Sequence, residues 1–226
     1  MKNITVIGAG IMGRGIAYTA ATSGYHVRLQ DISAKALENA KEYIQTELKK
    51  SVDSGYLKPG EDRESLNRLS FTTSIEEAAA EADLVIEAVL EKIEIKVGVF
   101  QKLDAICPAH TVLATNTSTM SPTEIGAQTS RPDKCIAMHF FNPPHKMKLV
   151  EIVRGLDTSD DTYEIAKEAA IGMGKEVVQV NEFPGFVTSR MNCLIGNEAM
   201  YMLMEGVASA EDIDKAIKLG LNHPMG

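Results

Sequence analysis

The chain has 226 residues, of which 44% are hydrophobic and 24% are charged, and its formal net charge is −8. These values are typical of a soluble globular protein and exclude a mainly disordered chain, a collagen-like chain or a coiled-coil rod. The acidic balance provides no general attraction for nucleic acid, so we expect no nucleic-acid partner.

Two further exclusions concern membranes and metals. No apolar stretch approaches 18 residues, so we expect no membrane span. The three cysteines, Cys107, Cys135 and Cys193, lie far apart and lack the spacing of metal ligands. They predict free thiols in a reducing compartment, which makes the cytoplasm the expected location, and no metal site.

The first elements form a recognisable unit. The β-branched run Ile4–Ile7 predicts a buried strand, which is followed by a glycine-rich turn, a helix over Ile11–Ser23 and a second strand over His26–Asp31. Such a succession predicts parallel strands joined by a right-handed crossover. Ser33 is expected to cap a long charged helix that extends to about Val52.

The remaining pattern predicts more strands and helices, and then helices alone. The predicted strands are Ser65–Thr73, Leu84–Val89, Thr111–Thr115, Lys134–Phe140, Leu149–Val153 and Glu176–Val180, and the predicted helices are Ile93–Ile106 and Thr162–Met173. From residue 184 onward only helical spacing remains. We therefore expect an α/β, Rossmann-type doubly wound domain over residues 1–183 and an incomplete, all-helical C-terminal domain over residues 184–226.

The turn after the first strand has the pattern G-x-G-x-x-G. Its context, between a strand and a helix, makes it more specific than the pattern alone. Gly8 permits the tight turn, Gly10 lets a pyrophosphate approach the backbone, and Gly13 lets the helix pack closely on the strand. The alternative is a glycine-rich turn that binds nothing.

The residues around this turn predict a dinucleotide. Asp31, at the end of the second strand, can accept hydrogen bonds from a ribose diol and would repel a 2′-phosphate, which favours NAD over NADP. The first N–H groups of the helix, at Ile11 and Met12, would face the phosphates. A local site of this kind needs no basic surface.

A histidine and a glutamate predict general-base chemistry. His139 ends an apolar run, at the carboxyl end of a predicted strand. Glu151 lies within another apolar strand, where a carboxylate needs a partner, and the turn Asn142–Pro144 could bring the two together. A carboxylate on one imidazole nitrogen raises the basicity of the other. The alternatives are a hydrogen-bonded core histidine and an ion pair of Glu151 with Lys146 or Lys148.

Ser118 is a further candidate because it follows the strand Thr111–Thr115. Its hydroxyl could lie near the His139 nitrogen and a substrate oxygen. It could instead terminate the strand or cap the next helix, although Ser121 could take the capping role.

At this point the chain closely resembles the L-3-hydroxyacyl-CoA dehydrogenases, especially the bacterial short-chain type. The resemblance covers the whole chain, and its most specific part is HFFNP followed by a glutamate. The matching segments are residues 6–17, 87–96, 114–120, 138–153, 184–190 and 211–226.

The resemblance implies an activity and a set of roles. The expected reaction is the NAD-dependent oxidation of an (S)-3-hydroxyacyl-CoA, such as 3-hydroxybutyryl-CoA, to the 3-ketoacyl-CoA. His139 would be the base, Glu151 its partner, and Ser118 would contact the substrate oxygen and the nicotinamide region. The cofactor would also meet Glu91, Lys96, Asn116 and Asn142.

The sequence departs from the family pattern in two places. Ser189 occupies a position where many members have an asparagine that helps to hold the substrate oxygen, so we hypothesise that Ser189 or Asn192 takes this role. The family also continues beyond the HPMG segment, so we expect a truncated chain, and the homodimer usual in the family is in doubt for it.

The contacts to CoA are harder to predict. The lysines of the charged helix, Lys35, Lys41, Lys49 and Lys50, could meet CoA phosphates or form a solvated helix face. Two other functions also remain open. One is a dehydrogenase of free β-hydroxy acids, although the members of that class with a catalytic lysine lack the His139–Glu151 pair. The other is a dinucleotide-binding protein without catalysis.

Overall fold

The computed structural model describes residues 1–224 and divides into two compact units. The first comprises Met1–Pro184 and the second begins at Gly185.

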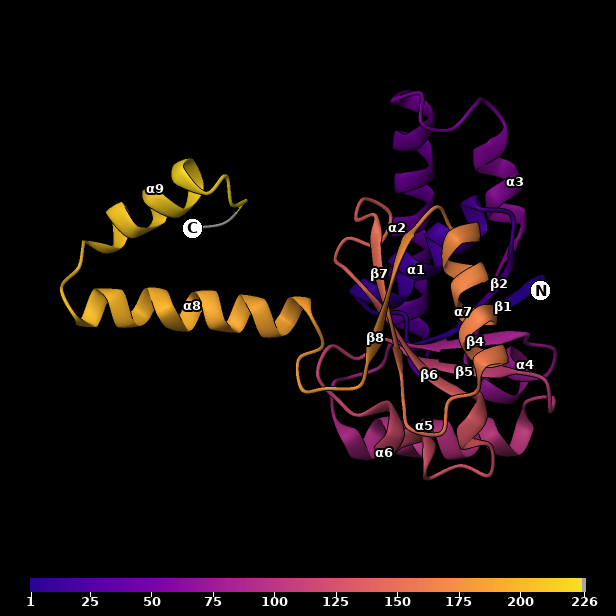
Figure 1. Ribbon diagram of the computed structural model, residues 1–226. Coiled ribbons are helices and arrows are strands. Elements are labelled where there is room, and N and C mark those ends of the chain that lie inside the picture. Colours follow the sequence, from indigo (N-terminus) through magenta and orange to yellow (C-terminus); the bar gives the residue numbers. More distant parts are fainter. Residues whose placement is uncertain (225–226) are drawn as a thin grey trace. The chain divides into compact units, whose positions relative to one another are not determined.

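The first unit is built on one eight-stranded sheet with the order β3-β2-β1-β4-β5-β6-β7-β8 (Figure 1). Neighbouring strands from β3 to β6 are parallel, β7 is antiparallel to β6, and β8 is parallel to β7. The strands are β1 (Asn3–Ile7), β2 (His26–Gln30), β3 (Leu69–Thr72), β4 (Leu84–Glu87), β5 (Val112–Thr115), β6 (Cys135–Phe140), β7 (Leu149–Arg154) and β8 (Glu176–Asn181). This order confirms the Rossmann-type doubly wound fold, whose ligands bind at the carboxyl ends of the strands where the order reverses.

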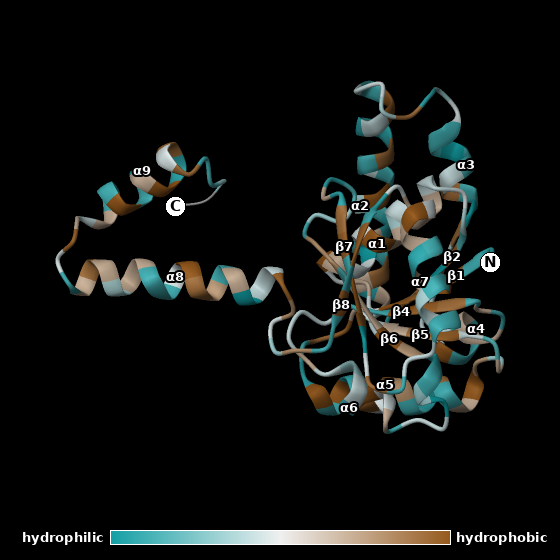
Figure 2. Cartoon of the chain, viewed as in Figure 1, coloured by the Kyte–Doolittle hydropathy of each residue, from teal (hydrophilic) through white to brown (hydrophobic). Residues whose placement is uncertain are grey.

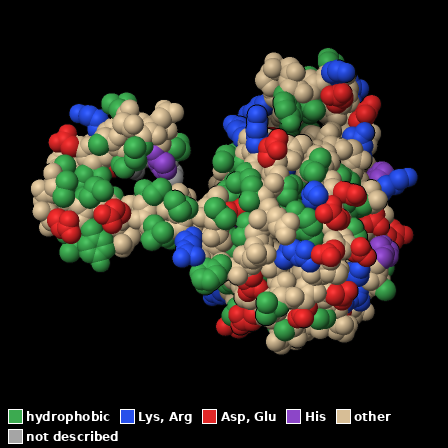
Figure 3. Space-filling model, in the orientation of Figure 1, with side chains coloured by type: hydrophobic (Ala, Val, Ile, Leu, Met, Phe, Trp, Pro, Cys, Tyr) green, Lys and Arg blue, Asp and Glu red, His purple; other side chains and the backbone are tan. Residues whose placement is uncertain are grey.

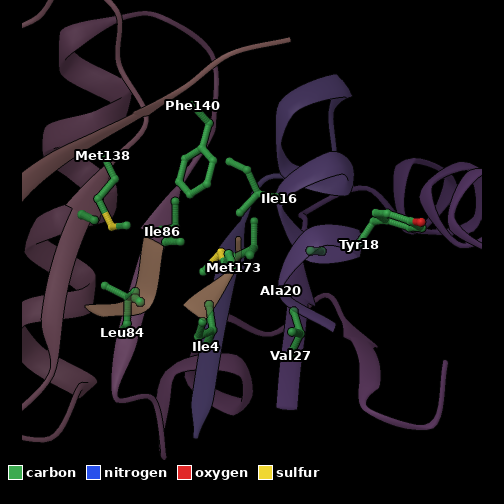
Figure 4. Close-up of a cluster of buried hydrophobic side chains, with 14 of the residues drawn as sticks. Ile4, Ile16, Tyr18, Ala20, Val27, Leu84, Ile86, Met138, Phe140 and Met173 are labelled. Atoms are coloured by element: carbon green, nitrogen blue, oxygen red, sulfur yellow. The ribbon is translucent and has the colours of Figure 1, made fainter. Parts of the chain in front are cut away.

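Helices cover both faces of the sheet. Residues of α1 (Ile11–Thr22), α2 (Ala34–Asp53) and α7 (Asp160–Gly172) share one hydrophobic cluster with the strands (Figure 4). Residues of α4 (Ile75–Ala79), α5 (Ile93–Ile106) and α6 (Pro122–Gly126) form a second cluster on the opposite face. The central strands β4, β5 and β6 are accordingly buried and mainly apolar (Figure 2), as is typical of a sheet covered on both sides.

One predicted strand is partly wrong. Residues 65–67 belong to the helix α3 (Glu61–Asn67), and the strand begins only at Leu69. The cause is local, because Glu61, Asp62 and Glu64 place negative charge in the first helical turn, where it is favourable. The short helix α4 was not predicted, because five residues are too few to show a helical period, whereas α6 begins after Ser121, the expected capping residue. They are capped by Ser74 and Ser121, which accept hydrogen bonds from the amides of Glu77 and Glu124.

The second unit contains two helices, α8 (Thr188–Met204) and α9 (Ala210–Gly220). The Ser209 hydroxyl accepts a hydrogen bond of 3.2 Å from the Asp212 amide and caps the start of α9. Many large apolar side chains of these helices are exposed (Figure 3), among them Met191, Leu194, Met200, Leu203, Met204 and Leu219. Within residues 1–224, no helix has the length and apolar character that a membrane crossing requires.

The hydrogen bonds of Arg131 are expected to stabilise the first unit. Its guanidinium donates to Asp104 Oδ1 at 2.8 Å and to the carbonyls of Asp104 and Pro108 at 2.8 and 2.7 Å. We expect Arg131→Met to lower the free energy of unfolding by about 2–3 kcal/mol, because it removes a charge-assisted hydrogen bond to Asp104 and the guanidinium donors to two carbonyls, although Ser130 still donates to Asp104 and the Thr111 amide to Pro108. Urea unfolding measures this loss. The exposed Arg63 of α3 supplies the control, and a loss as large in Arg63→Met would contradict the explanation.

Candidate functional site

His139 and Glu151 lie opposite each other on two hydrogen-bonded strands. The register of β6 and β7 pairs the two residues directly, and His139 Nδ1 lies 2.8 Å from Glu151 Oε2. Glu151 is 1% exposed and His139 is 7% exposed, so this contact is shielded from water. The predicted hairpin-like return is therefore present. Since the carboxylate accepts the proton of Nδ1, the other nitrogen, Nε2, is left with a lone pair that can take a proton.

His139 also lines an open pocket of about 390 Å³ at the carboxyl ends of β4, β5 and β6. Its wall brings together residues that are far apart in the sequence, namely Met12, Ala88, Val89, Glu91, Asn116, Ser118, His139, Phe140, Phe141 and Asn142. Six of the predicted site residues thus share one cavity. The ring of His139 is further held by Phe141, whose ring centroid is 4.5 Å away.

Asn116 ties two strand ends together at this pocket. Its Oδ1 accepts a hydrogen bond of 2.9 Å from the backbone amide of Phe140, the residue after His139. Because the oxygen is engaged, the group that Asn116 can offer a ligand is its amide NH₂. The same contact fixes the end of β6, and therefore the position of His139, against β5.

Glu91 is held by several donors at the edge of the same pocket. It accepts hydrogen bonds from the Thr117 hydroxyl and from the Ser118 amide, and Lys96 Nζ lies 3.0 Å from its Oε2. Burial opposes its ionisation, but the bonds from Thr117 and Lys96 outweigh this, so its pKa is lowered. Glu91 is therefore a fixed negative charge that also orients the loop carrying Ser118.

Lys96 is 1% exposed and lies between two carboxylates. Its Nζ donates to both oxygens of Glu87, at 2.9 and 3.2 Å, as well as contacting Glu91. All three protons of the ammonium can thus be used within the protein. Lys96 therefore belongs to an ion-pair network with Glu87 and Glu91. Lys96 itself is not among the residues that line the pocket.

Glu87 is a residue of this network that the sequence interpretation missed. It is 0% exposed, and Thr115 Oγ1 and the Val89 amide each donate to it at 2.7 Å. The signal was available, because Glu87 interrupts the apolar run of β4 just as Glu151 interrupts that of β7. Applied to both glutamates, the rule that a buried carboxylate needs partners would have found it.

Two of the three glycines of the glycine-rich turn, Gly8 and Gly13, have no room for a side chain. Gly8 has a φ of +100°, and a Cβ at Gly13 would lie 1.7 Å from the Gly8 carbonyl oxygen. A Cβ at Gly10 would meet no atom within 4 Å, so the space above this residue is open. Helix α1 begins here without a side-chain cap, which leaves its first N–H groups, at Ile11 and Met12, to an outside acceptor. This uncapped, uncrowded helix start fits the pyrophosphate of a dinucleotide.

Asp31 adjoins this turn and supports it. Its Oδ2 accepts a hydrogen bond of 2.8 Å from the Ala9 amide, and its Oδ1 accepts one of 2.9 Å from the Ser33 amide. These bonds fix the carboxylate at the end of β2 beside the turn. At this position the Asp31 carboxylate would contact the ribose of a bound dinucleotide.

The other candidates lie on helices α8 and α2. Ser189 and Asn192 belong to α8 of the second unit, where Asn192 lines a hollow between α8 and α9. On α2, Lys35 pairs with Glu38 and Lys50 pairs with Glu47, each at 2.7 Å. These two lysines have partners on their own helix, which agrees with the alternative that they form a solvated helix face.

Comparison with known proteins identifies both parts of the chain. The model of the NAD-binding domain of 3-hydroxyacyl-CoA dehydrogenase matches residues 3–183, and that of the C-terminal domain of the same enzyme matches residues 185–226. A probable 3-hydroxybutyryl-CoA dehydrogenase of Bacillus subtilis is 47% identical over the whole chain, which covers 78% of that protein. A 3-hydroxyadipyl-CoA dehydrogenase of Escherichia coli is 42% identical, and the chain covers 47% of it. The solved (S)-3-hydroxybutyryl-CoA dehydrogenase of Ralstonia eutropha superposes with a TM-score of 0.96 at 39% identity, covering the whole chain and 80% of that structure.

Proposed function

Since the chain belongs to the 3-hydroxyacyl-CoA dehydrogenase family, and is thus an NAD-dependent oxidoreductase, we propose that it oxidises (S)-3-hydroxybutyryl-CoA to the 3-ketoacyl-CoA with His139 as general base. The observation that carries the assignment of the site is the buried His139–Glu151 pair in the wall of a pocket, in the same unit as the glycine-rich turn. The names of the relatives from Bacillus subtilis and Ralstonia eutropha support the four-carbon substrate.

The geometry of the pocket suggests a role for each residue in the hydride and proton transfers. NAD, when bound, accepts the hydride that leaves C3 of the substrate. His139 Nε2 takes the proton of the C3 hydroxyl, and Glu151 stabilises the imidazolium that forms. In the reverse direction the imidazolium returns this proton to the oxygen. Base catalysis of this kind contributes about 10² to 10⁴-fold.

Other residues of the pocket are proposed to position the reactants. The Ser118 hydroxyl would donate to the substrate oxygen near His139, and Asn116 would offer its amide N–H groups. Asn142 would border the nicotinamide from the turn after β6. Glu91, with its lowered pKa, keeps its negative charge at neutral pH and would meet the cofactor, whereas Lys96 would act on it through Glu91.

Ser189 and Asn192 offer a prediction on substrate binding. We propose that one of them donates a hydrogen bond to the substrate oxygen. Removing a donor to a developing oxyanion lowers kcat by about 10² to 10³-fold, so one of the variants Ser189→Ala and Asn192→Ala is expected to lose this much. Steady-state kinetics of the two single variants measure the loss. If both retain the kcat/KM of the parent chain, neither residue has the role.

The second unit supports a proposal on assembly. The family resemblance implies a homodimer, and the exposed apolar side chains of α8 and α9 are the surface that an obligate interface would bury. Light scattering after size-exclusion chromatography is expected to give the mass of two chains, and the mass of one chain would refute the dimer. We also place the chain in the cytoplasm, because its cysteines are free thiols.

The substrate assay separates this function from its alternatives. The chain is expected to oxidise NADH with acetoacetyl-CoA and not with free acetoacetate. Turnover of the free acid would identify a dehydrogenase of β-hydroxy acids. Binding of NADH without turnover of either compound would identify a dinucleotide-binding protein without this activity, and would refute the proposal.

A further inference from the structure

The turn between β6 and β7 has an unusual position in the site. These residues, 141–148, which we call the active-site turn, join the strand of His139 directly to the strand of Glu151. The turn also carries Phe141 and Asn142 into the wall of the pocket. Any displacement of the turn therefore moves Asn142 and changes the alignment of the two strands that hold the His139–Glu151 pair.

A buried lysine outside the pocket holds this turn. Lys175 Nζ donates to the carbonyl oxygens of Pro144 and Met147, at 2.5 and 2.9 Å. Lys175 is 8% exposed, and burial lowers the pKa of its ammonium. Both of its hydrogen-bond acceptors are neutral carbonyls of the active-site turn. Burying a lysine against neutral acceptors is costly, and an apolar side chain would fill the space at less cost.

The backbone on both sides of Lys175 fixes where its side chain starts. Helix α7 ends in a Schellman motif, in which Gly174 has a φ of +72° and the Lys175 amide donates to the Ala170 carbonyl at 3.0 Å. The next amide, that of Glu176, donates to the Lys148 carbonyl at 2.8 Å and begins β8. The ammonium is thus presented from a rigid junction of helix and sheet.

The same turn is also in contact with the helix that carries the glycine motif. A Cβ at Gly15 of α1 would lie 2.7 Å from Pro144 Cδ, so Pro144 packs against the helix backbone itself. Gly15 lies two residues after Gly13, the last glycine of the dinucleotide motif. The active-site turn is therefore held both by Lys175 and by its contact with the helix that would bind the pyrophosphate.

We infer that Lys175 is a positioning residue of the dehydrogenase: its buried ammonium holds the active-site turn through Pro144 and Met147, and thereby sets the geometry of Asn142 and of the His139–Glu151 pair. The inference rests on the proposed function for its effect on turnover. Neither the sequence motifs nor the family resemblance assigned a role to this residue.

The test compares two substitutions of Lys175 with a control on the turn itself. Lys175→Met keeps the length of the side chain and removes its donors, whereas Lys175→Arg keeps the charge and the N–H donors. Lys146→Met is the control, because Lys146 is an exposed lysine of the same turn. If Lys175→Met does not fold, Lys175→Gln takes its place in the comparison.

We expect Lys175→Met to lower kcat with acetoacetyl-CoA by about 10- to 100-fold, the loss that a small misplacement of catalytic groups produces. The Kd of NADH is expected to rise much less than kcat falls, since the glycine-rich turn is unchanged and only the contact of Asn142 with the cofactor is altered. Lys175→Arg should recover most of kcat, and Lys146→Met should retain it. A Lys175→Met variant with full kcat, or a Lys175→Arg variant no better than Lys175→Met, would overturn the inference.

A second measurement does not depend on turnover. The proton of His139 Nδ1, which is hydrogen-bonded to Glu151, gives a downfield NMR resonance that His139→Asn identifies by its loss. This resonance is expected to shift or broaden in Lys175→Met and to stay in place in Lys146→Met. An unmoved resonance in Lys175→Met contradicts the positioning role. If the parent chain does not reduce acetoacetyl-CoA, the proposed function fails, but this comparison still decides the role of Lys175.

Discussion

Substitution of His139 by asparagine is expected to lower kcat with acetoacetyl-CoA by about 10² to 10⁴-fold, the contribution of a positioned general acid or base. Asparagine is chosen because its amide can replace Nδ1 as the donor to Glu151, so that the buried carboxylate keeps a partner. The group that disappears is Nε2. The loss corresponds to about 3–5 kcal/mol of activation free energy.

Binding of NADH and thermal unfolding serve as controls for the His139→Asn variant. Because His139 is proposed to act on the substrate hydroxyl and not to hold the cofactor, the Kd of NADH, measured by fluorescence titration, should not change. Thermal unfolding checks that the variant folds. A variant that binds NADH normally and still reduces the thioester at the parental rate would remove His139 from the mechanism.

The second large effect is expected at Gly10. A Cβ there meets no protein atom within 4 Å, so Gly10→Ala should fold normally. In the bound state the methyl group would occupy the space in which the pyrophosphate approaches the backbone. We expect the Kd of NADH to rise about 10- to 100-fold, which corresponds to the loss of one charge-assisted hydrogen bond or somewhat more.

Two other glycines make this result interpretable. Gly98, inside α5, also has open space around it, and Gly98→Ala should leave the Kd unchanged and stabilise the chain by about 1 kcal/mol. Gly13→Ala should lose both stability and binding, since its Cβ would lie 1.7 Å from the Gly8 oxygen. If NADH binds to Gly10→Ala as tightly as to the parent chain, the turn is not the pyrophosphate site.

Much of the fold is predictable because its signals are local. The run Ile4–Ile7, the glycines after it and the strand ending at Gln30 form a continuous pattern, and this pattern determines the first βαβ unit. The error at Ser65 has the opposite cause, since the acidic first turn of α3 outweighs the strand-like spacing of the residues that follow.

The candidate site was predictable only in part. The pairing of His139 with Glu151 could be expected, because a buried carboxylate requires a partner and a short turn joins the two strands. The ion pair of Glu87 with Lys96 joins β4 to α5, and the bonds of Lys175 join the end of α7 to the active-site turn. Such contacts depend on how helices pack on the sheet, and no sequence spacing encodes that packing.

A single-turnover experiment tests the central claim, that the His139 pocket carries out thioester-specific hydride transfer. The chain, loaded with NADH, is mixed with acetoacetyl-CoA, and NADH fluorescence and the CoA product are followed together. We expect one 3-hydroxybutyryl-CoA for each NADH consumed in the parent chain, and a slow or absent reaction in the His139→Asn variant with the same amount of bound NADH. Equal NADH consumption by the two chains, or equally fast consumption with free acetoacetate, would contradict it.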